Sequence, residues 1–250
     1  MKYNICVATQ IKSVNLSEIS ASIKKVISLN PTTIEFRFDY IDDVQNLNLK
    51  SISDLLDLVP RKIPVIFTFR NSNEGGKTKI GEENRIEIIK KLIEAQPSYL
   101  DIEINTEKSK LKELVNLAFQ NNVKVIFSYH DFEKTPSYEI AYNKVQGYVN
   151  KLTRECGFSL DEIQGSLIKV IFKANSLQDN LIPLLLCRKI SESKHQIISF
   201  CMGNKGIFSR VLCVLSGSFL TYASAEEKTA PGQIEIELMR DLLNTLTRRN

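Results

Sequence analysis

Short apolar runs rich in β-branched residues recur along the chain, and longer amphipathic stretches separate them. Runs of roughly four to eight such residues predict buried strands, whereas apolar positions at helical spacing predict helices. The predicted strands span residues 3–9, 33–40, 64–70, 99–104, 123–130, 166–173, 196–202 and 219–223. Predicted helices between them include residues 16–28, 82–95, 108–121 and 139–156. Eight rounds of strand–helix alternation predict an α/β protein whose parallel sheet closes into a (β/α)8 TIM barrel.

An open, doubly wound sheet is the structural alternative, because it shows the same alternation. No glycine-rich G-x-G-x-x-G motif follows a strand, which argues against a dinucleotide-binding version of that fold. A length of 250 residues suits one barrel, and no linker or repeat divides the chain. We therefore expect a single catalytic barrel domain over residues 1–250.

Charge, hydropathy and cysteine content limit the kinds of partner and the cellular compartment that we expect. The net charge of +4 arises from dispersed residues, so we expect no nucleic-acid partner. No apolar run reaches the roughly 18 residues of a membrane span, and the N-terminal segment is too short and polar for a signal peptide. The five cysteines form no C-x-x-C pair, which favours free thiols in a reducing compartment. These features predict a cytoplasmic protein without membrane contact.

The second predicted strand carries an unusual row of charges. Glu35, Arg37 and Asp39 share one face by period-two alternation, and Ile34, Phe36 and Phe38 occupy the other. An edge strand with a wet face would explain the charges. The apolar alternation favours instead a strand that is buried on both faces, with an ionic network on one of them.

Barrel active sites lie at the C-terminal ends of the strands, so polar residues there are candidates. Arg70 ends the third strand before a Gly-Gly loop and could bind an anion or a hydroxyl. His130 ends the fifth strand and could move protons near neutral pH. His195 precedes a strand, so it belongs at the opposite face and receives no role. An exposed loop charge and a structural histidine remain open for Arg70 and His130.

Lysine within the sixth strand is the most informative feature. Central strands of a barrel are buried on both faces, and burial favours the neutral, nucleophilic amine that attacks carbonyl groups. Lys169 and Lys173 share a face but lie about 13 Å apart along an extended strand. Position favours Lys169 as the nucleophile and Lys173 as a strand-end cation, without excluding the reverse.

Loops after the last two strands carry further candidates. Residues 202–211 form a glycine-flanked loop that opens a helix with Arg210, an arrangement that suits a carboxylate or phosphate. Residues 225–233 end in Pro-Gly-Gln and could close over the site. A solvated arginine and an ordinary loop explain these segments equally well at this point.

These motifs together resemble one enzyme family. The set comprises E-F-R-F-D, F-T-F-R followed by E-G-G, S-Y-H-D-F, the strand-six lysine, M-G-N-K-G-I-F-S-R and A-P-G-Q. In this order, over nearly the whole chain, it resembles the type I 3-dehydroquinate dehydratases of the shikimate pathway. The resemblance implies a hydro-lyase that dehydrates 3-dehydroquinate through a Schiff base. It also implies a homodimer that needs neither cofactor nor metal.

The resemblance implies roles for the catalytic candidates. The family's lysine precedes an aspartate by ten residues, and here Asp179 stands ten residues after Lys169, so Lys169 would form the Schiff base. His130 would be the proton shuttle, and Glu74 would help to hold its orientation or state.

Substrate-binding roles follow from the same resemblance. Glu35, Arg37 and Arg70 would contact substrate hydroxyls and the polar network, and Arg210 would bind the substrate carboxylate. Gln233 would reach the ring substituents from the closing loop. Thr229 replaces the usual serine but keeps its hydroxyl, and Phe200 replaces a common methionine. Residues 170–174 also depart from the family pattern. Apolar wall positions are matched by Phe200, Met202 and Tyr222.

Two other functions are compatible with parts of this set. A class I aldolase-type barrel would share the imine-forming lysine, but E-F-R-F-D and A-P-G-Q argue against it. A non-catalytic barrel that binds a small acid is the second alternative. Retention of His130, Lys169 and Arg210 together argues against a purely binding role.

Overall fold

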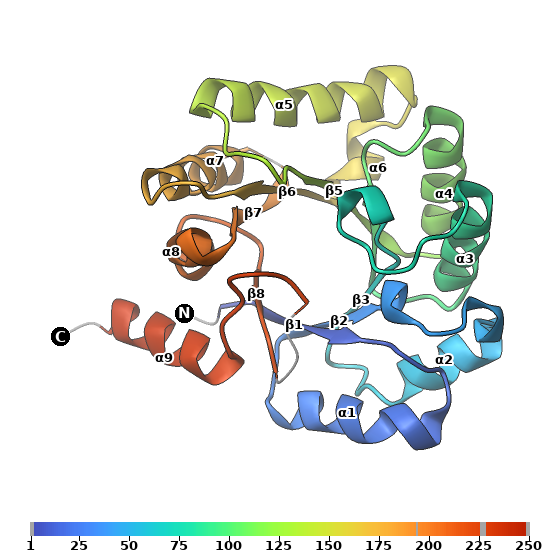
Figure 1. Ribbon diagram of the computed structural model, residues 1–250. Helices are drawn as coiled ribbons and strands as arrows, with labels where there is room; N and C mark the ends of the chain where they lie inside the picture. The colour runs from blue at the N-terminus through green and yellow to red at the C-terminus, as the bar shows by residue number, and fades with distance from the viewer. Residues whose placement is uncertain (1–2, 194, 226–228, 249–250) are drawn as a thin grey trace.

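Eight parallel strands form the centre of the computed structural model, which describes residues 3–193, 195–225 and 229–248. Helices alternate with the strands and surround them (Figure 1). The strands are β1 (Ile5–Gln10), β2 (Thr33–Arg37), β3 (Val65–Thr68), β4 (Tyr99–Glu103), β5 (Lys124–His130), β6 (Leu167–Lys173), β7 (Gln196–Met202) and β8 (Thr221–Ala223).

Strand order confirms the predicted barrel. Strands β1 to β7 are neighbours in chain order, and β8 pairs with the free edge of β1. Just before β8, the amide of Phe219 donates to the carbonyl of Ile197 on β7 at 2.7 Å, which nearly closes the ring. A doubly wound sheet would reverse its strand order midway, so that alternative is wrong.

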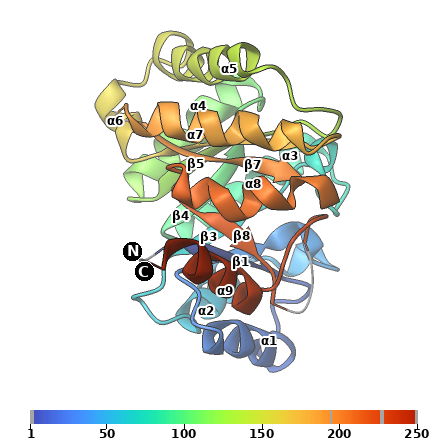
Figure 2. The same ribbon diagram turned by 90° about the vertical axis from the view of Figure 1, so that its left-hand side faces the viewer.

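The outer layer consists of helices that pack their apolar faces on the strands. Figure 2 shows α7, α8 and α9 along one side of the barrel. The helices are α1 (Leu16–Ser28), α2 (Leu49–Asp57), α3 (Glu82–Glu94), α4 (Lys108–Gln120), α5 (Tyr138–Asn150), α6 (Leu160–Gln164), α7 (Leu181–Ser191), α8 (Ile207–Leu212) and α9 (Ile236–Thr247). The predicted helix over 139–156 is shorter, because Lys151–Glu155 widen into a π-helical turn. Apolar periodicity does not distinguish this wider turn from an α-helix.

Strand β2 ends earlier than its alternation predicted. Residues Phe38–Tyr40 form a 3-10 turn, so Asp39 leaves the strand face that it was expected to share with Glu35 and Arg37. Its carboxylate turns back onto Arg37, with Nε–Oδ1 and Nη2–Oδ2 distances of 2.7 and 2.9 Å. The bidentate pair holds the Arg37 guanidinium at the strand end.

The prediction that β2 is buried on both faces is confirmed. On one face, Phe36 and Phe38 pack against Phe67 of β3, with ring centroids 5.8 and 4.9 Å from that ring. Burial stabilises the fold by about 1.5–3 kcal/mol for each such side chain. Glu35 and Arg37 occupy the other face, whose charges are costly to bury. Burial of the aromatic cluster helps to offset the free-energy cost of burying these charges.

Two further features of the fold are the state of its cysteines and the length of its helices. All five cysteines are buried and free, as the sequence predicted. Within the described residues, none of the helices has the length and apolar character that crossing a membrane requires.

Candidate active site

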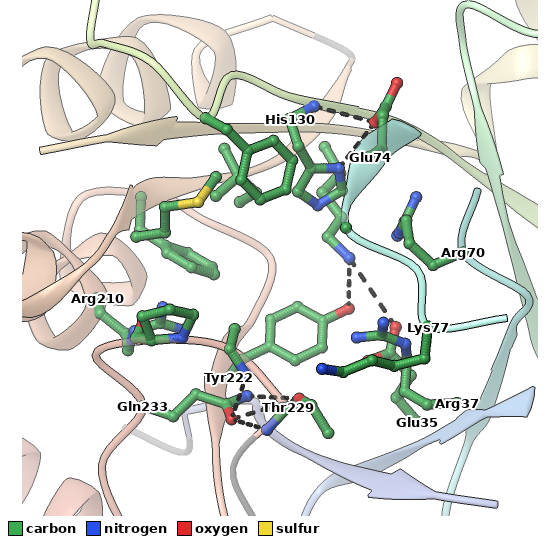
Figure 3. Close-up of a pocket in the computed structure, with 18 of the residues that line it drawn as sticks. Glu35, Arg37, Arg70, Glu74, Lys77, His130, Arg210, Tyr222, Thr229 and Gln233 are labelled. Carbon is green, nitrogen blue, oxygen red and sulfur yellow. Dashed lines mark hydrogen bonds and ion pairs between the residues drawn. The ribbon is translucent and has the colours of Figure 1, made fainter. Parts of the chain in front are cut away.

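A cavity of about 670 Å³ opens at the C-terminal end of the barrel, where the predicted site residues meet (Figure 3). Its lining draws on six of the strands and on the loops that follow them. The predicted residues that line it are Glu35, Arg37, Arg70, Glu74, His130, Lys169, Arg210, Thr229 and Gln233. Side chains more than 190 residues apart in the sequence therefore face one space.

Lys169 lies mid-way along β6 and is buried, with 5% of its surface exposed. Its Nζ donates to Asp101 Oδ2 at 2.9 Å and to the Tyr222 hydroxyl at 3.2 Å, and it lies 3.9 Å from Glu35 Oε1. The sequence predicted an amine among apolar strands, whereas the structure surrounds it with polar groups. Lys173 is exposed at the end of β6, as predicted for a strand-end cation.

Asp101 on β4 is the residue that sequence reasoning missed. It accepts hydrogen bonds from Lys169 and from the Ser128 hydroxyl, and Arg70 Nη2 lies 2.9 Å from its Oδ2. Burial opposes ionisation, yet the charges of Arg70 and Lys169 hold the pKa of Asp101 well below its usual range. The clue was the alternation of Asp101 and Glu103 with apolar residues in a buried strand, the same pattern as in β2.

Arg70 anchors this ionic network. Its Nη1 donates to Glu103 Oε1 at 2.8 Å and to Ser128 Oγ at 2.7 Å, while Nη2 pairs with Asp101. Glu103 also accepts from the buried Arg85 at 2.8 Å. Burial lowers the pKa of Arg70, but the charges of Asp101 and Glu103 raise it more strongly. The guanidinium is therefore charged. Arg70 lines the cavity and holds Asp101 directly through Nη2, and it also contacts Ser128, whose hydroxyl donates to Asp101.

His130 and Glu74 form a second pair across the cavity. Glu74 Oε2 lies 3.0 Å from His130 Nδ1 and also accepts from the His130 backbone amide at 3.2 Å. Burial raises the pKa of Glu74 to about 7, against the opposing charge of Arg70. Burial and the charges of Arg70 and Lys169 lower the pKa of His130 well below its usual value. The imidazole is therefore neutral near pH 7. In that range, Glu74 is the member of the pair that gains or loses a proton.

The two glycines after Glu74 are required by the turn that presents it. Gly75 has φ +85°, in the left-handed region. A Cβ on Gly76 would lie 1.9 Å from the carbonyl oxygen of Arg70, which no side chain can tolerate. The E-G-G motif therefore fixes the position of the carboxylate beside His130.

Arg210 on α8 is buried rather than solvated, which excludes the loop-cation alternative. Its guanidinium carbon lies 4.4 Å from the Phe200 ring centroid, and Nη2 donates to the Pro231 carbonyl at 3.4 Å. Among the described residues, its Nε has no hydrogen-bond partner and no acidic side chain pairs with it. Burial lowers the pKa of Arg210 to about 10, which leaves it charged at neutral pH. A buried cation with an unpaired donor suits a ligand carboxylate.

The loop after β8 folds onto itself beside the cavity. Gln233 Oε1 accepts from the Thr229 amide at 2.7 Å, and Gln233 Nε2 donates to Thr229 Oγ1 at 3.1 Å. The Tyr40 hydroxyl donates to the Thr229 carbonyl at 3.4 Å, linking the loop to the segment after β2. The predicted closing loop is thus described only in part, since residues 226–228 lie outside the described residues.

Three residues line the cavity in ways that the sequence did not indicate. Tyr222 was placed with Phe200 and Met202 in an apolar wall, and all three line the cavity, but the Tyr222 hydroxyl contacts Lys169. Tyr40 and Lys77 lie near the mouth, with Lys77 Nζ 5.9 Å from the Tyr40 ring centroid. Among the described residues, no group of three or more acidic, cysteine or histidine side chains is placed to hold a metal ion.

Known proteins are similar to this chain in sequence and in architecture. The sequence profile of the type I 3-dehydroquinase family matches residues 5–250. A 3-dehydroquinate dehydratase of Listeria innocua is 31% identical over 245 residues, covering 97% of this chain and 92% of its own. One from Pyrococcus abyssi is 30% identical over 229 residues, covering 91% and 94%.

Solved structures agree with the sequence comparison. The type I 3-dehydroquinate dehydratase of Clostridium difficile, solved with covalently modified comenic acid, superposes with a TM-score of 0.80 at 28% identity. That match covers 98% of this chain and 92% of the other. A 3-dehydroquinate dehydratase from Aquifex aeolicus gives a TM-score of 0.74 at 29% identity, covering 98% and 99%. The chain therefore belongs to the type I 3-dehydroquinase family, whose named members are 3-dehydroquinate dehydratases, hydro-lyases of the shikimate pathway.

Proposed function

We propose that the protein dehydrates 3-dehydroquinate to 3-dehydroshikimate through an imine on Lys169. The observation that carries the proposal is the buried Lys169 amine, held 2.9 Å from Asp101 and facing a cavity that also contains His130 and Arg210. A buried amine beside a proton-transfer group is the arrangement that covalent catalysis on a ketone requires.

Imine formation begins with proton transfer and attack. The Lys169 nitrogen must be uncharged to attack, and the neutral His130 imidazole accepts its surplus proton. The amine then adds to the ring ketone to give a carbinolamine. Return of the proton from His130 lets the carbinolamine oxygen leave as water. The resulting iminium is an electron sink that acidifies the adjacent C–H bond.

Elimination then uses His130 again. Neutral His130 removes the proton next to the iminium carbon and returns it to the departing hydroxyl, so one group serves both proton transfers. Glu74 holds Nδ1 and thereby directs Nε2 at the substrate. Hydrolysis of the product imine regenerates Lys169.

Charge and hydrogen bonding place the substrate. Arg210 binds the substrate carboxylate through its unpaired donor, stacked on Phe200. Glu35, Arg37 and Arg70 contact ring hydroxyls from the opposite side of the cavity. Contacts with Thr68, Asp39 and Asp101, respectively, keep them in place. Thr229 and Gln233 approach from the loop after β8, where they line the same cavity.

Borohydride trapping tests the proposed nucleophile. Reduction in the presence of 3-dehydroquinate is expected to leave a ligand-sized mass on the peptide that contains Lys169, because borohydride converts the hydrolysable imine into a stable secondary amine. Peptide mass spectrometry gives the site. Lys173→Met is the matched control, and it should trap normally because Lys173 is exposed at the end of the strand. A modification at Lys173 in the unsubstituted protein would overturn the assignment.

The Glu74–His130 pair predicts how turnover depends on pH. Ionised Glu74 accepts a hydrogen bond from Nδ1–H, which leaves the Nε2 lone pair free to act as a base. Protonated Glu74 donates to Nδ1 and places the proton on Nε2, which then cannot accept another. Because the pKa of Glu74 is about 7, kcat is expected to rise as pH increases through 7.

Glu74→Gln removes that titration. Its amide can donate to Nδ1 at every pH, so kcat should fall on the order of 10²-fold and lose the inflection near pH 7. Glu83→Gln, which replaces an exposed carboxylate on α3, is the control and should keep the profile. An unchanged inflection in the Glu74 variant would exclude this carboxyl as its source.

We also propose a homodimer, as the family resemblance implies. Exposed apolar side chains on neighbouring helices support it: Leu181 and Leu185 on α7 and Phe208 on α8. Light scattering at micromolar concentration should give twice the 28.5 kDa of one chain. The mass of a single chain would reject the dimer.

A cytoplasmic location completes the proposal. Five buried free thiols fit a reducing compartment, and the described helices include none that could cross a membrane. Cell fractionation checks this, and recovery mainly outside the cytoplasmic fraction would contradict it.

A further inference from the structure

The hydroxyl of Tyr222 contacts the nitrogen on which the proposed chemistry occurs. Tyr222 projects from β8 into the cavity (Figure 3), and 4% of its surface is exposed. Its oxygen accepts from Lys169 Nζ at 3.2 Å, and the same Nζ lies 4.6 Å from its ring centroid. The tilted Phe200 ring packs against it at 6.1 Å. The phenol is therefore fixed in place with its oxygen directed at the reacting nitrogen.

Asp101 and Tyr222 contact the same nitrogen but differ in what they can do with a proton. The Asp101 carboxylate also binds Arg70 and Ser128, and its depressed pKa makes it a poor proton acceptor. Burial, and then the charge of Glu35, raise the pKa of the Tyr222 phenol well above its usual value. The phenol keeps its proton, so it can accept one proton only while giving up its own.

The Tyr222 proton is available to a ligand. Among the described residues, Lys169 is the only hydrogen-bond partner of the Tyr222 hydroxyl. A phenol has one donor and accepts through its oxygen lone pairs. Because the lone pair faces Lys169 and the residue lines the cavity, the O–H can turn to an oxygen bonded next to that nitrogen.

We propose that Tyr222 is a catalytic residue that relays a proton from the Lys169 nitrogen to the ketone oxygen of the substrate as the carbinolamine forms. This inference rests on the proposed imine at Lys169. It adds Tyr222 to that proposal as a proton-transfer group, in a role that His130 and Glu74 do not perform.

The relay balances without forming a phenolate. Attack of the neutral amine forms the N–C bond and moves the carbonyl π pair onto oxygen, which leaves a positive nitrogen and a negative oxygen. One proton passes from nitrogen to the Tyr222 oxygen while the Tyr222 proton passes to the substrate oxygen. The phenol is regenerated and the carbinolamine is neutral. The same path in reverse serves breakdown of the carbinolamine formed from the product imine.

Tyr222→Phe removes one oxygen and keeps the ring. The variant and the unsubstituted protein are each mixed with 3-dehydroquinate and quenched with borohydride at increasing times. Mass spectrometry then gives the mass of the peptide that contains Lys169. Substrate and product adducts differ by one water, so the time course separates imine formation from elimination. Imine formation is expected to slow on the order of 10²-fold, while the rate at which the substrate imine converts to the product imine before the quench stays unchanged.

Tyr99→Phe is the matched control, because it removes a phenolic hydroxyl from the start of β4, at the other end of the barrel. It should leave both steps at their original rates. Imine formation at the original rate in Tyr222→Phe would overturn the relay, and so would an equal slowing of both steps, which indicates a packing role. Absence of a Lys169 adduct in the unsubstituted protein would instead reject the imine itself.

Discussion

The contact between Asp101 and Lys169 is the interaction on which the rest of the site depends. A lysine buried within a barrel strand is costly unless a partner compensates it, and Asp101 lies 2.9 Å from its nitrogen. Arg70 and Ser128 in turn hold Asp101, so the position of the amine is set by groups on three other strands or strand ends. The charged groups that stabilise the buried lysine also orient its amine toward the cavity. The interactions that stabilise the barrel interior therefore also position the reactive nitrogen.

The fold makes that ionic interior tolerable. Each inward charge on β2 alternates with a phenylalanine on the opposite face, and Phe36, Phe38 and Phe67 pack together there. Apolar burial between sheet and helices offsets the cost of a charged barrel lining. The same parallel arrangement brings the C-terminal strand ends to one rim, where the Glu74 turn, the His130 imidazole and Arg210 line the same cavity as Lys169. The proposed relay uses the Tyr222 phenol, which this geometry places 3.2 Å from the nitrogen.

Much of this could be predicted from the sequence. Alternation located the strands, and the position of strand ends in a barrel brought His130, Arg70 and Arg210 to one rim. Two kinds of feature were out of reach. Asp39 leaves the β2 face because the chain turns after Arg37, and period-two alternation cannot show where a strand stops. Asp101 and the Tyr222 hydroxyl matter through contacts with Lys169 from strands distant in the sequence, and spacing along one strand does not report which side chains meet across the barrel.

The central claim is that one buried amine captures the ketone covalently. Turnover of 3-dehydroquinate by Lys169→Met tests this most directly, followed by the ultraviolet absorption of the conjugated product, with folding checked by thermal unfolding. A folded variant should lose activity by more than about 10³-fold, because methionine fills the space but has no nucleophilic nitrogen. Dehydration at the original rate by that variant would contradict the account.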